Sequence, residues 1–312
     1  MSEARVEFSF DGALDLAATL RPLGVAFHDP TLRASATEAV RATRTPEGPA
    51  TLHAALDAPG VVTARAWGPG AGWLLDRARS WLALDDTAST WGLTPNVNLR
   101  GIGRRGAGGR LARTDRVFEL LVPIVLEQLV SGAESSRAFS RLVRRYSERA
   151  PGPFDDLWLP LGPAQIRAIP MAAFPACGAL PRQGATLHEL ARRATRVEEA
   201  AAMDADAAER RLMAFPGVGI WTARNAMLRG MGHPDAVPLG DYGLANVVAY
   251  NLAGEERADD ARMLALLEPY RGQRGRVVRW IESAGAMPPR RGPRAALREI
   301  DPAGRALLRG GA

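Results

Sequence analysis

The 312-residue chain contains no lysine, and its 40 basic side chains are all arginine. A side-chain Schiff base with a carbonyl substrate needs a lysine, so enzymes that use this covalent intermediate are excluded unless the N-terminal amine serves. The phosphate-binding lysine of a P-loop nucleotidase is missing for the same reason. The lack of lysine therefore excludes both side-chain Schiff-base chemistry and P-loop nucleotide hydrolysis.

Cysteine and histidine are also scarce. The single cysteine, Cys177, rules out a disulfide framework and any four-cysteine zinc site or iron–sulfur cluster. The histidines lack ligand spacing: they are His28, His53, His188 and His233. No apolar run reaches about 18 residues, and the first residues lack the apolar core of a signal peptide. We therefore expect a soluble cytoplasmic protein with no membrane partner.

The charge balance is modestly basic. The 40 arginines outnumber the 34 acidic residues, which leaves a formal net charge of +6 at pH 7. A positive excess suits a polyanionic partner such as nucleic acid, but an excess this small needs a motif beside it to carry weight. The length allows one to three domains.

The apolar pattern indicates an α+β N-terminal part followed by a mainly helical body. Residues 13–20 and 73–84 have helical periodicity, whereas 39–44 and 61–67 alternate like strands between Pro/Gly turns. We expect an antiparallel sheet with two helices on one face. The predicted divisions are an N-terminal domain over 1–100, a Gly/Arg-rich linker over 101–113, a helical body over 114–285 and an arginine-rich tail over 286–312.

Helical spacing dominates after the linker. The first helix is expected to begin near Thr114, its N-cap, and to kink at Pro123. Its apolar face consists of Val117, Phe118, Leu121, Val125 and Leu129. Further helices are predicted over 135–149, 187–203, 206–214, 221–231, 242–252, 259–267 and 274–284.

Residues 101–106, Gly-Ile-Gly-Arg-Arg-Gly, match the glycine pattern of a dinucleotide-binding loop. The surroundings do not fit that function, because more Gly and Arg follow up to residue 112 and no strand–helix–strand unit encloses the pattern. A linker whose arginines touch phosphates is the better interpretation.

The most informative segment is Phe-Pro-Gly-Val-Gly-Ile-Trp-Thr-Ala at 215–223. Its glycines permit a tight turn between two helices, where the amide groups of Gly217, Val218 and Gly219 can bind a phosphate. Alone, Pro-Gly-x-Gly between helices is often only a turn. An isolated acid, Asp241, lies twenty residues after Trp221, and its presence at this spacing favours a functional hairpin over a simple turn.

The hairpin and the acid at this spacing resemble the helix-hairpin-helix DNA glycosylase superfamily, in which such a hairpin precedes the catalytic aspartate. Trp221 and the following Thr-Ala are similar to the 3-methyladenine DNA glycosylase II branch. The likeness extends to Leu-Glu-Gln-Leu-Val-Ser at 126–131 and to Glu-Pro-Tyr-Arg at 268–271. The chain departs from relatives at Gly240 and Asn225, which leaves the substrate range open.

The resemblance implies an enzyme that binds damaged double-stranded DNA as a monomer associated with the nucleoid. It would extrude a base and excise alkylated purines of the 3-methyladenine or 7-methylguanine type in base excision repair. Asp241 would stabilise the oxocarbenium-like sugar, although an aspartate there is often only an N-cap. Lyase-type relatives carry their Schiff-base lysine where this chain has Trp221, so the enzyme is expected to be monofunctional.

The resemblance also assigns the remaining roles. Leu129 would fill the gap left by the base, although periodicity alone places it in the core. Trp221, Asn225 and Tyr270 would line the base pocket, where aromatic faces attract a cationic purine; core packing is the alternative. The expected DNA contacts are Gln128, Leu129, Ser131, Gly217, Val218, Gly219 and Thr222. No cofactor is required, and a monovalent cation would be held by the carbonyls of Met213, Phe215 and Val218.

Two other functions compete with this hypothesis. One is a glycosylase for deaminated or oxidised bases, which the same motifs would serve. The other is a non-catalytic binder of damaged DNA, against which the acid at position 241 argues, because phosphate binding gives no reason for it.

Overall fold

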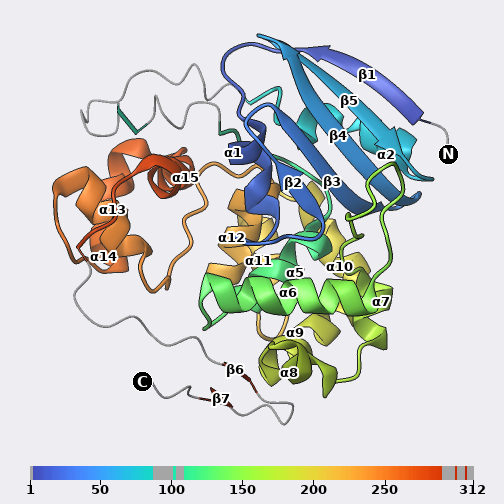
Figure 1. Ribbon diagram of the computed structural model, residues 1–312. Helices are drawn as coiled ribbons and strands as arrows, with labels where there is room; N and C mark the ends of the chain where they lie inside the picture. The colour runs from blue at the N-terminus through green and yellow to red at the C-terminus, as the bar shows by residue number, and fades with distance from the viewer. Residues whose placement is uncertain (1–2, 87–100, 103–108, 290–298, 301–305, 308–312) are drawn as a thin grey trace, which may run out of the picture.

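A computed structural model describes residues 3–86, 101–102, 109–289, 299–300 and 306–307. Its N-terminal part holds a five-stranded antiparallel sheet with the order β1-β5-β4-β3-β2 (Figure 1). The strands are β1 (Glu3–Ser9), β2 (Leu32–Ala34), β3 (Glu38–Thr45), β4 (Gly48–Ala58) and β5 (Val61–Trp67). The predicted α+β fold class is confirmed.

Short helices cover one face of the sheet. They are α1 (Leu16–Leu20), the 3-10 turn η1 (Arg21–Leu23), α2 (Ala71–Asp76) and α3 (Ala78–Trp81). Apolar residues of these helices and of strands β4 and β5 belong to one buried cluster, as alternation along the strands requires. A smaller cluster covers the opposite face of β3, where Val40 and Ala42 meet Leu157 and Leu159.

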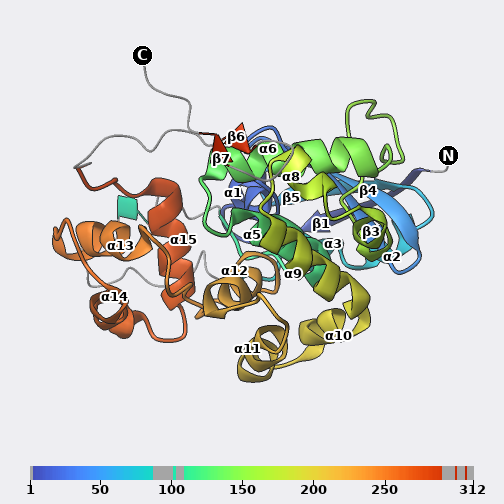
Figure 2. The ribbon, with the colours of Figure 1, turned by 90° about the horizontal axis from the view of Figure 1, so that it is seen from below.

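The rest of the described chain is mainly helical (Figures 1 and 2). Its first helices are α5 (Val117–Glu127), α6 (Gly132–Tyr146), α7 (Pro163–Ala168), α8 (Ala173–Cys177), α9 (Pro181–Arg192) and α10 (Ala194–Glu198). After η3 (Glu199–Ala202) come α11 (Ala205–Met213), α12 (Ile220–Gly230), α13 (Leu244–Ala253), α14 (Asp260–Leu267), η4 (Glu268–Tyr270) and α15 (Arg274–Ala284). Two short strands come last, β6 (Glu299–Ile300) and β7 (Ala306–Leu307).

The main core runs from the sheet into the helical body. Most buried apolar residues from 16–84 and 111–236 form one cluster, and a second cluster joins Ile102 to residues 237–281. A buried ion pair also crosses between the sheet and α5, because Arg41 Nη2 lies 3.0 Å from Glu119 Oε1. Thr43 Oγ1 donates to the other Glu119 oxygen at 2.8 Å, so the buried carboxylate is well paired.

Several predicted helix boundaries are wrong. The helix expected over 73–84 is split at Arg77, and the one over 187–203 is divided into α9, α10 and η3. Thr114 is not the N-cap of α5: its hydroxyl donates to the carbonyl of Gly230, while the Val117 amide donates to Glu198 Oε2 at 2.8 Å. The cap thus comes from α10, which local sequence does not reveal.

Two predicted segments fall largely outside the described residues. Of the glycine pattern at 101–106, the residues 103–106 are not described, and the same holds for most of the tail over 286–312. The predicted linker and tail remain predictions. In the part of the chain that is described, no helix has the length and apolar character needed to cross a membrane.

Candidate active site and nucleic-acid interface

Helices α11 and α12 flank a tight hairpin over residues 214–219. Gly217 has a φ of +82°, and a Cβ there would lie 2.0 Å from Thr186 Oγ1, so both conformation and space require glycine. Gly219 is the N-cap of α12 and has no neighbouring atom within 4 Å of an added Cβ. The predicted helix–turn–helix is therefore present, with its second glycine exposed.

The amide groups of this hairpin are only partly engaged. Val218 donates to the carbonyl of Phe215 at 3.0 Å and closes the turn. Among the described residues, no protein acceptor is found for the amides of Gly217 and Gly219. These two donors, together with the free first amides of α12, form a site suited to a phosphate oxygen.

Asp241 lies in the loop between α12 and α13, and both of its oxygens are bound. Oδ1 accepts the amides of Gly243 and Leu244, each at 3.0 Å, at the start of α13. Oδ2 accepts the indole Nε1–H of Trp221 at 2.8 Å. The spacing of twenty residues thus brings the acid against the helix that follows the hairpin.

The Asp241 loop is itself anchored at two points. Asp260 of α14 accepts the Gly240 amide at 2.7 Å, immediately before the acid. Asp235 accepts the amides of Gly272 and Arg274 at 2.8 and 3.0 Å. These hydrogen bonds hold the Asp241 loop in one position relative to α14 and α15. A carboxylate that stabilises a developing charge must be held in place in this way. The helix expected from Tyr242 begins instead at Leu244, with Gly243 as its N-cap.

A partly buried ion pair lies near the site. Glu127, the last residue of α5, and Arg229 of α12 meet at 2.8 Å, and each side chain is 18% exposed. Burial raises the pKa of Glu127, and the charges of Glu282 and Asp241 add to this effect while Arg229 opposes it. Burial alone would lower the pKa of Arg229, but the surrounding carboxylates outweigh it and raise the pKa. A permanent cation therefore lies within electrostatic range of Asp241.

The turn between α5 and α6, residues 128–131, presents Leu129 to solvent. Leu129 is 66% exposed and has a φ of +61°, a left-handed conformation that is costly for a leucine. The side-chain Nε2 of Gln128 donates to the Gly217 carbonyl at 3.0 Å and to Thr222 Oγ1 at 2.8 Å. The buried Gln183 donates to the Gln128 carbonyl at 2.9 Å. The α5–α6 turn is thus tied to the hairpin and holds an apolar tip outward.

Three predicted DNA contacts are engaged within the protein. Thr222 is 2% exposed and binds Gln128, and the Val218 side chain is buried. Ser131 is the N-cap of α6, in a capping box with Glu134. Gln183 was missed by sequence reasoning, since a lone glutamine inside a helix carries no signal.

The three predicted pocket residues have different surroundings. Trp221 is half-buried beside Asp241, and the carbonyl of Trp221 accepts the Asn225 side-chain amide at 2.9 Å. Tyr270 is 5% exposed and belongs to the second core cluster. A fourth aromatic, Tyr242, adjoins Asp241 and is fully exposed; only its neighbourhood in the sequence could have singled it out.

The predicted cation ligands lie at the end of α11 and in the hairpin. Phe215 already accepts the Val218 amide, but a carbonyl oxygen has a second lone pair for a cation. The carbonyls of Met213 and Val218 complete the predicted set. Within the described ranges, no group of three His, Cys, Asp or Glu side chains could hold a metal ion.

Comparison with known proteins finds two informative sequence relatives. The chain is 32% identical over 155 residues to DNA-3-methyladenine glycosylase 2 of Escherichia coli, which covers 47% of this chain and 54% of that protein. It is 31% identical over 172 residues to a Mycobacterium tuberculosis protein named "Probable bifunctional transcriptional activator/DNA repair enzyme AlkA", covering 52% of this chain and 33% of that protein. The chain thus spans about a third to a half of the length of these relatives. No family model matches the chain.

Solved structures share the fold over most of the chain. A 3-methyladenine DNA glycosylase from Archaeoglobus fulgidus has a TM-score of 0.73 at 15% identity, covering 88% of this chain and 96% of that chain. An 8-oxoguanine glycosylase/lyase from Clostridium acetobutylicum has a TM-score of 0.67 at 13% identity, covering 91% and 98%. The resemblance to helix-hairpin-helix DNA glycosylases, and in sequence to the 3-methyladenine glycosylase II branch, is confirmed.

Proposed function

We propose that this protein is a DNA glycosylase that extrudes an alkylated purine and hydrolyses its N-glycosidic bond. The observation that carries the proposal is the fixed carboxylate of Asp241, bound by Trp221 and two helix amides beside a hairpin suited to phosphate binding. The sequence likeness to DNA-3-methyladenine glycosylase 2 supports the same activity.

Bond cleavage leaves positive charge on the sugar, and Asp241 is the acid placed to stabilise it. A preorganised carboxylate in a site that excludes water contributes several kcal/mol to such a transition state. A methylated purine cation is already a good leaving group, so no second acid is needed to protonate it. The cationic base also suits the half-buried indole of Trp221.

Extrusion of the base is assigned to the α5–α6 turn. Leu129 points outward and would replace the stacking lost by the departing base, as apolar wedges do in other DNA-bending proteins. Gln128 holds the turn against the hairpin, so we assign it a positioning role. The hairpin amides would meanwhile bind a phosphate of the lesion strand.

Water, rather than a lysine, is proposed as the nucleophile, because the chain has no lysine to form a Schiff base. The enzyme would act as a monomer, and a monovalent cation at the hairpin carbonyls would add positive charge near the phosphate. One neighbour of similar fold is titled a glycosylase/lyase, so fold alone does not separate the two mechanisms.

The runner-up is a glycosylase for oxidised or deaminated bases, which the structural likeness to an 8-oxoguanine glycosylase/lyase favours. Duplexes that each hold one modified base separate the two. Faster release of 3-methyladenine and 7-methylguanine than of hypoxanthine or 8-oxoguanine supports the proposal, since a cationic base leaves readily and attracts aromatic faces. A preference for neutral bases would promote the runner-up.

The role of Asp241 is tested by Asp241→Asn. We expect base release to fall by about 100-fold or more while duplex affinity is kept, because only the transition state requires the charge. Asp259→Asn is the matched control, since Asp259 also caps a helix, α14, through the Arg262 amide. Activity of Asp241→Asn equal to that of the control would remove Asp241 as the catalyst. Duplex binding without base release by the wild type would instead favour a non-catalytic binder.

A further inference from the structure

Four arginines on the exposed side of α6 have no acidic partner in the described structure. Arg137, Arg141, Arg144 and Arg145 are exposed; Arg137 and Arg141 lie one helical turn apart, and Arg144 and Arg145 follow one turn later. None of them forms a salt bridge with a described residue, whereas other arginines of the helical body do, such as Arg224, Arg229 and Arg274. The nearest acid on α6, Glu134, is engaged in the capping box with Ser131.

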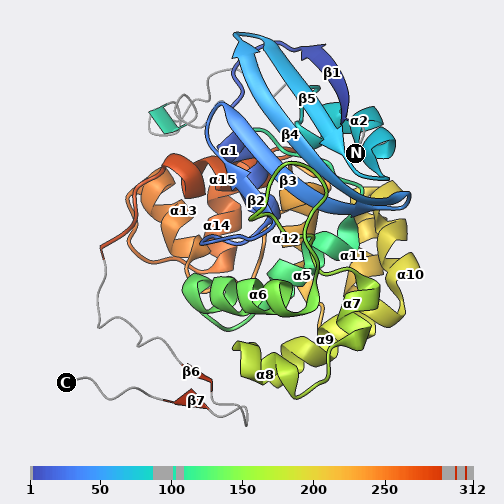
Figure 3. The same ribbon diagram turned by 45° about the vertical axis from the view of Figure 1, so that its right-hand side comes forward.

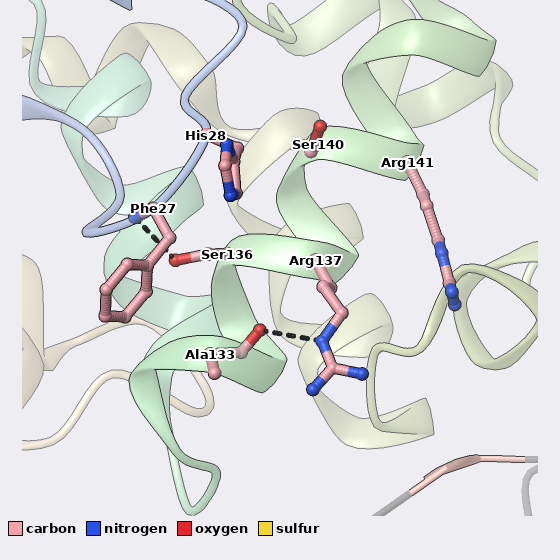
Figure 4. Close-up of a pocket in the computed structure, with 7 residues that line it drawn as sticks. All are labelled: Phe27, His28, Ala133, Ser136, Arg137, Ser140 and Arg141. Carbon is pink, nitrogen blue, oxygen red and sulfur yellow. Dashed lines mark hydrogen bonds between the residues drawn. The ribbon is translucent and has the colours of Figure 1, made fainter. Parts of the chain in front are cut away.

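A hollow of about 520 Å³ lies beside the first two of these arginines (Figure 4). The loop before β2 forms one wall with Phe27 and His28, and α6 forms the other with Ser136, Ser140, Arg137 and Arg141. The Phe27 amide donates to Ser136 Oγ at 3.2 Å and holds the loop on the helix. Phe27 is nevertheless 55% exposed, so its ring is available for contact with a ligand.

The hollow adjoins the α5–α6 turn. Helix α6 begins at Gly132, three residues after Leu129, and the Phe27 ring lies 4.0 Å from a Cβ built on Gly132. The hairpin contacts the same turn through Gln128. The α5–α6 turn that carries Leu129 is thus in contact with the hairpin through Gln128 and leads directly into α6, which Figure 3 labels.

We propose that Arg137 and Arg141, with the Phe27–His28 loop, bind the DNA strand opposite the extruded base. The arginines would contact its phosphates, and the exposed Phe27 ring would pack on a sugar. A duplex opened at Leu129 presents one strand to the hairpin and the other to the far side of the turn, which is where this surface lies. The inference rests on the proposed function for the position of the duplex.

The charge pattern fits a phosphate backbone better than a protein partner. Two cations lie one helical turn, about 5.4–6 Å, apart, and guanidinium groups bind phosphates through paired hydrogen bonds. Serine hydroxyls and one aromatic ring complete a surface that can bind sugar and phosphate without recognising sequence. Each phosphate contact contributes about 0.9 to the slope of log affinity against log salt.

The first test measures the affinity for undamaged duplex DNA over a range of salt concentrations. Arg137→Gln with Arg141→Gln should lower that slope by about 1.8, because two phosphate contacts are lost. Arg5→Gln with Arg196→Gln is the control: it removes the same charge from β1 and α10, which lie away from the start of α6 (Figures 1 and 3). An unchanged slope in the α6 variant, or an equal loss in the control, overturns the proposal.

A second test identifies the strand. A duplex with a tetrahydrofuran abasic site fixes the register, and uncharged methylphosphonate linkages are placed in either strand near that site. Neutral linkages opposite the site should weaken DNA binding by the wild type. They should not further weaken binding by the α6 variant (Arg137→Gln with Arg141→Gln), since that variant has already lost the phosphate contacts. Neutral linkages in the lesion strand should weaken both proteins equally.

The outcomes separate this inference from the proposed function. If neutral linkages opposite the site weaken duplex binding of the α6 variant as much as that of the wild type, the inference is overturned. Base excision by the wild type would be unaffected by that result. Duplex binding with the expected slope but no base release would overturn the proposed function and leave the α6 surface as a DNA contact. Exposed arginines that form no ion pair can be replaced without unfolding, and an unchanged thermal midpoint checks this.

Discussion

Leu129 combines an exposed apolar side chain with a left-handed backbone. Such a conformation costs about 1–3 kcal/mol and persists only where the surroundings impose it, here through the hydrogen bonds of Gln128 and Gln183 to neighbouring elements. Periodicity alone placed this leucine in the core. Its exposure agrees instead with a role as a wedge.

We expect Leu129→Ala to impair excision of well-paired lesions by about 10-fold, because the gap left by the base is no longer filled. Mispaired lesions should be affected less, since their extrusion costs less. Protein stability should hardly change, because the side chain is exposed. Excision rates on matched pairs of duplexes measure the difference, and Met171→Ala, another exposed apolar residue, is the control. Equal losses on both duplexes would argue against a wedge.

Trp221 is tied to Asp241 by a hydrogen bond rather than by packing alone. Its indole N–H donates to Asp241 Oδ2 at 2.8 Å. Trp221→Phe keeps a ring but loses a hydrogen bond to a charged group, which is worth about 1.5–3 kcal/mol. Single-turnover base release should therefore slow by about 10- to 100-fold with duplex affinity unchanged. Trp158→Phe is the control, because the Trp158 indole N–H has no acceptor among the described residues; a Trp221 variant as active as this control would refute the positioning role.

Among the elements, the hairpin between α11 and α12 has two glycines with different constraints. Gly217 faces Thr186 and has a positive φ, so any substitution there distorts the turn as well as the phosphate site. Gly219 has an extended backbone and open space around it. It is the position at which phosphate binding can be tested without disturbing the fold.

Gly219→Asp should weaken binding to damaged and undamaged duplex alike, by about 10-fold, because a negative charge would face the bound phosphate. The aspartate is also a favourable N-cap for α12, so the protein should be no less stable to heat. Gly219→Asn supplies a neutral side chain of the same shape as the control. Binding isotherms for the three proteins measure the effect, and similar affinities for Asp and Asn variants would exclude a phosphate at this position.

At the scale of the whole molecule, the absence of lysine excludes a Schiff base with a lysine side chain at any site. Borohydride should trap no side-chain-linked adduct between the wild-type protein and DNA, and the product should be an intact abasic strand until alkali is added. Trp221→Lys supplies the missing amine beside Asp241 and should yield a trapped adduct. An adduct of the wild type that maps away from the N-terminus would contradict the monofunctional mechanism.

The sequence by itself determined the features that composition and local pattern encode. Strand β5 and helix α15 begin and end where alternation and helical spacing predict, and the glycines at 217 and 219 mark the hairpin because only a short list of residues permits that turn. The lysine-free composition restricted the mechanism. The acid at position 241 was identified through its spacing from the hairpin.

Only the tertiary structure decided which partners these residues have. Strands β1, β2 and β4 and helices α7 and α8 were not predicted. Elements as short as β2, α7 and α8 carry only a weak local signal, because neighbouring elements fix their conformation. Likewise, Thr222 and Ser131 look equally available in the sequence, yet both are engaged within the protein. The hydrogen bonds that place Asp241 and the α5–α6 turn join residues far apart in the chain, and no local pattern encodes such contacts.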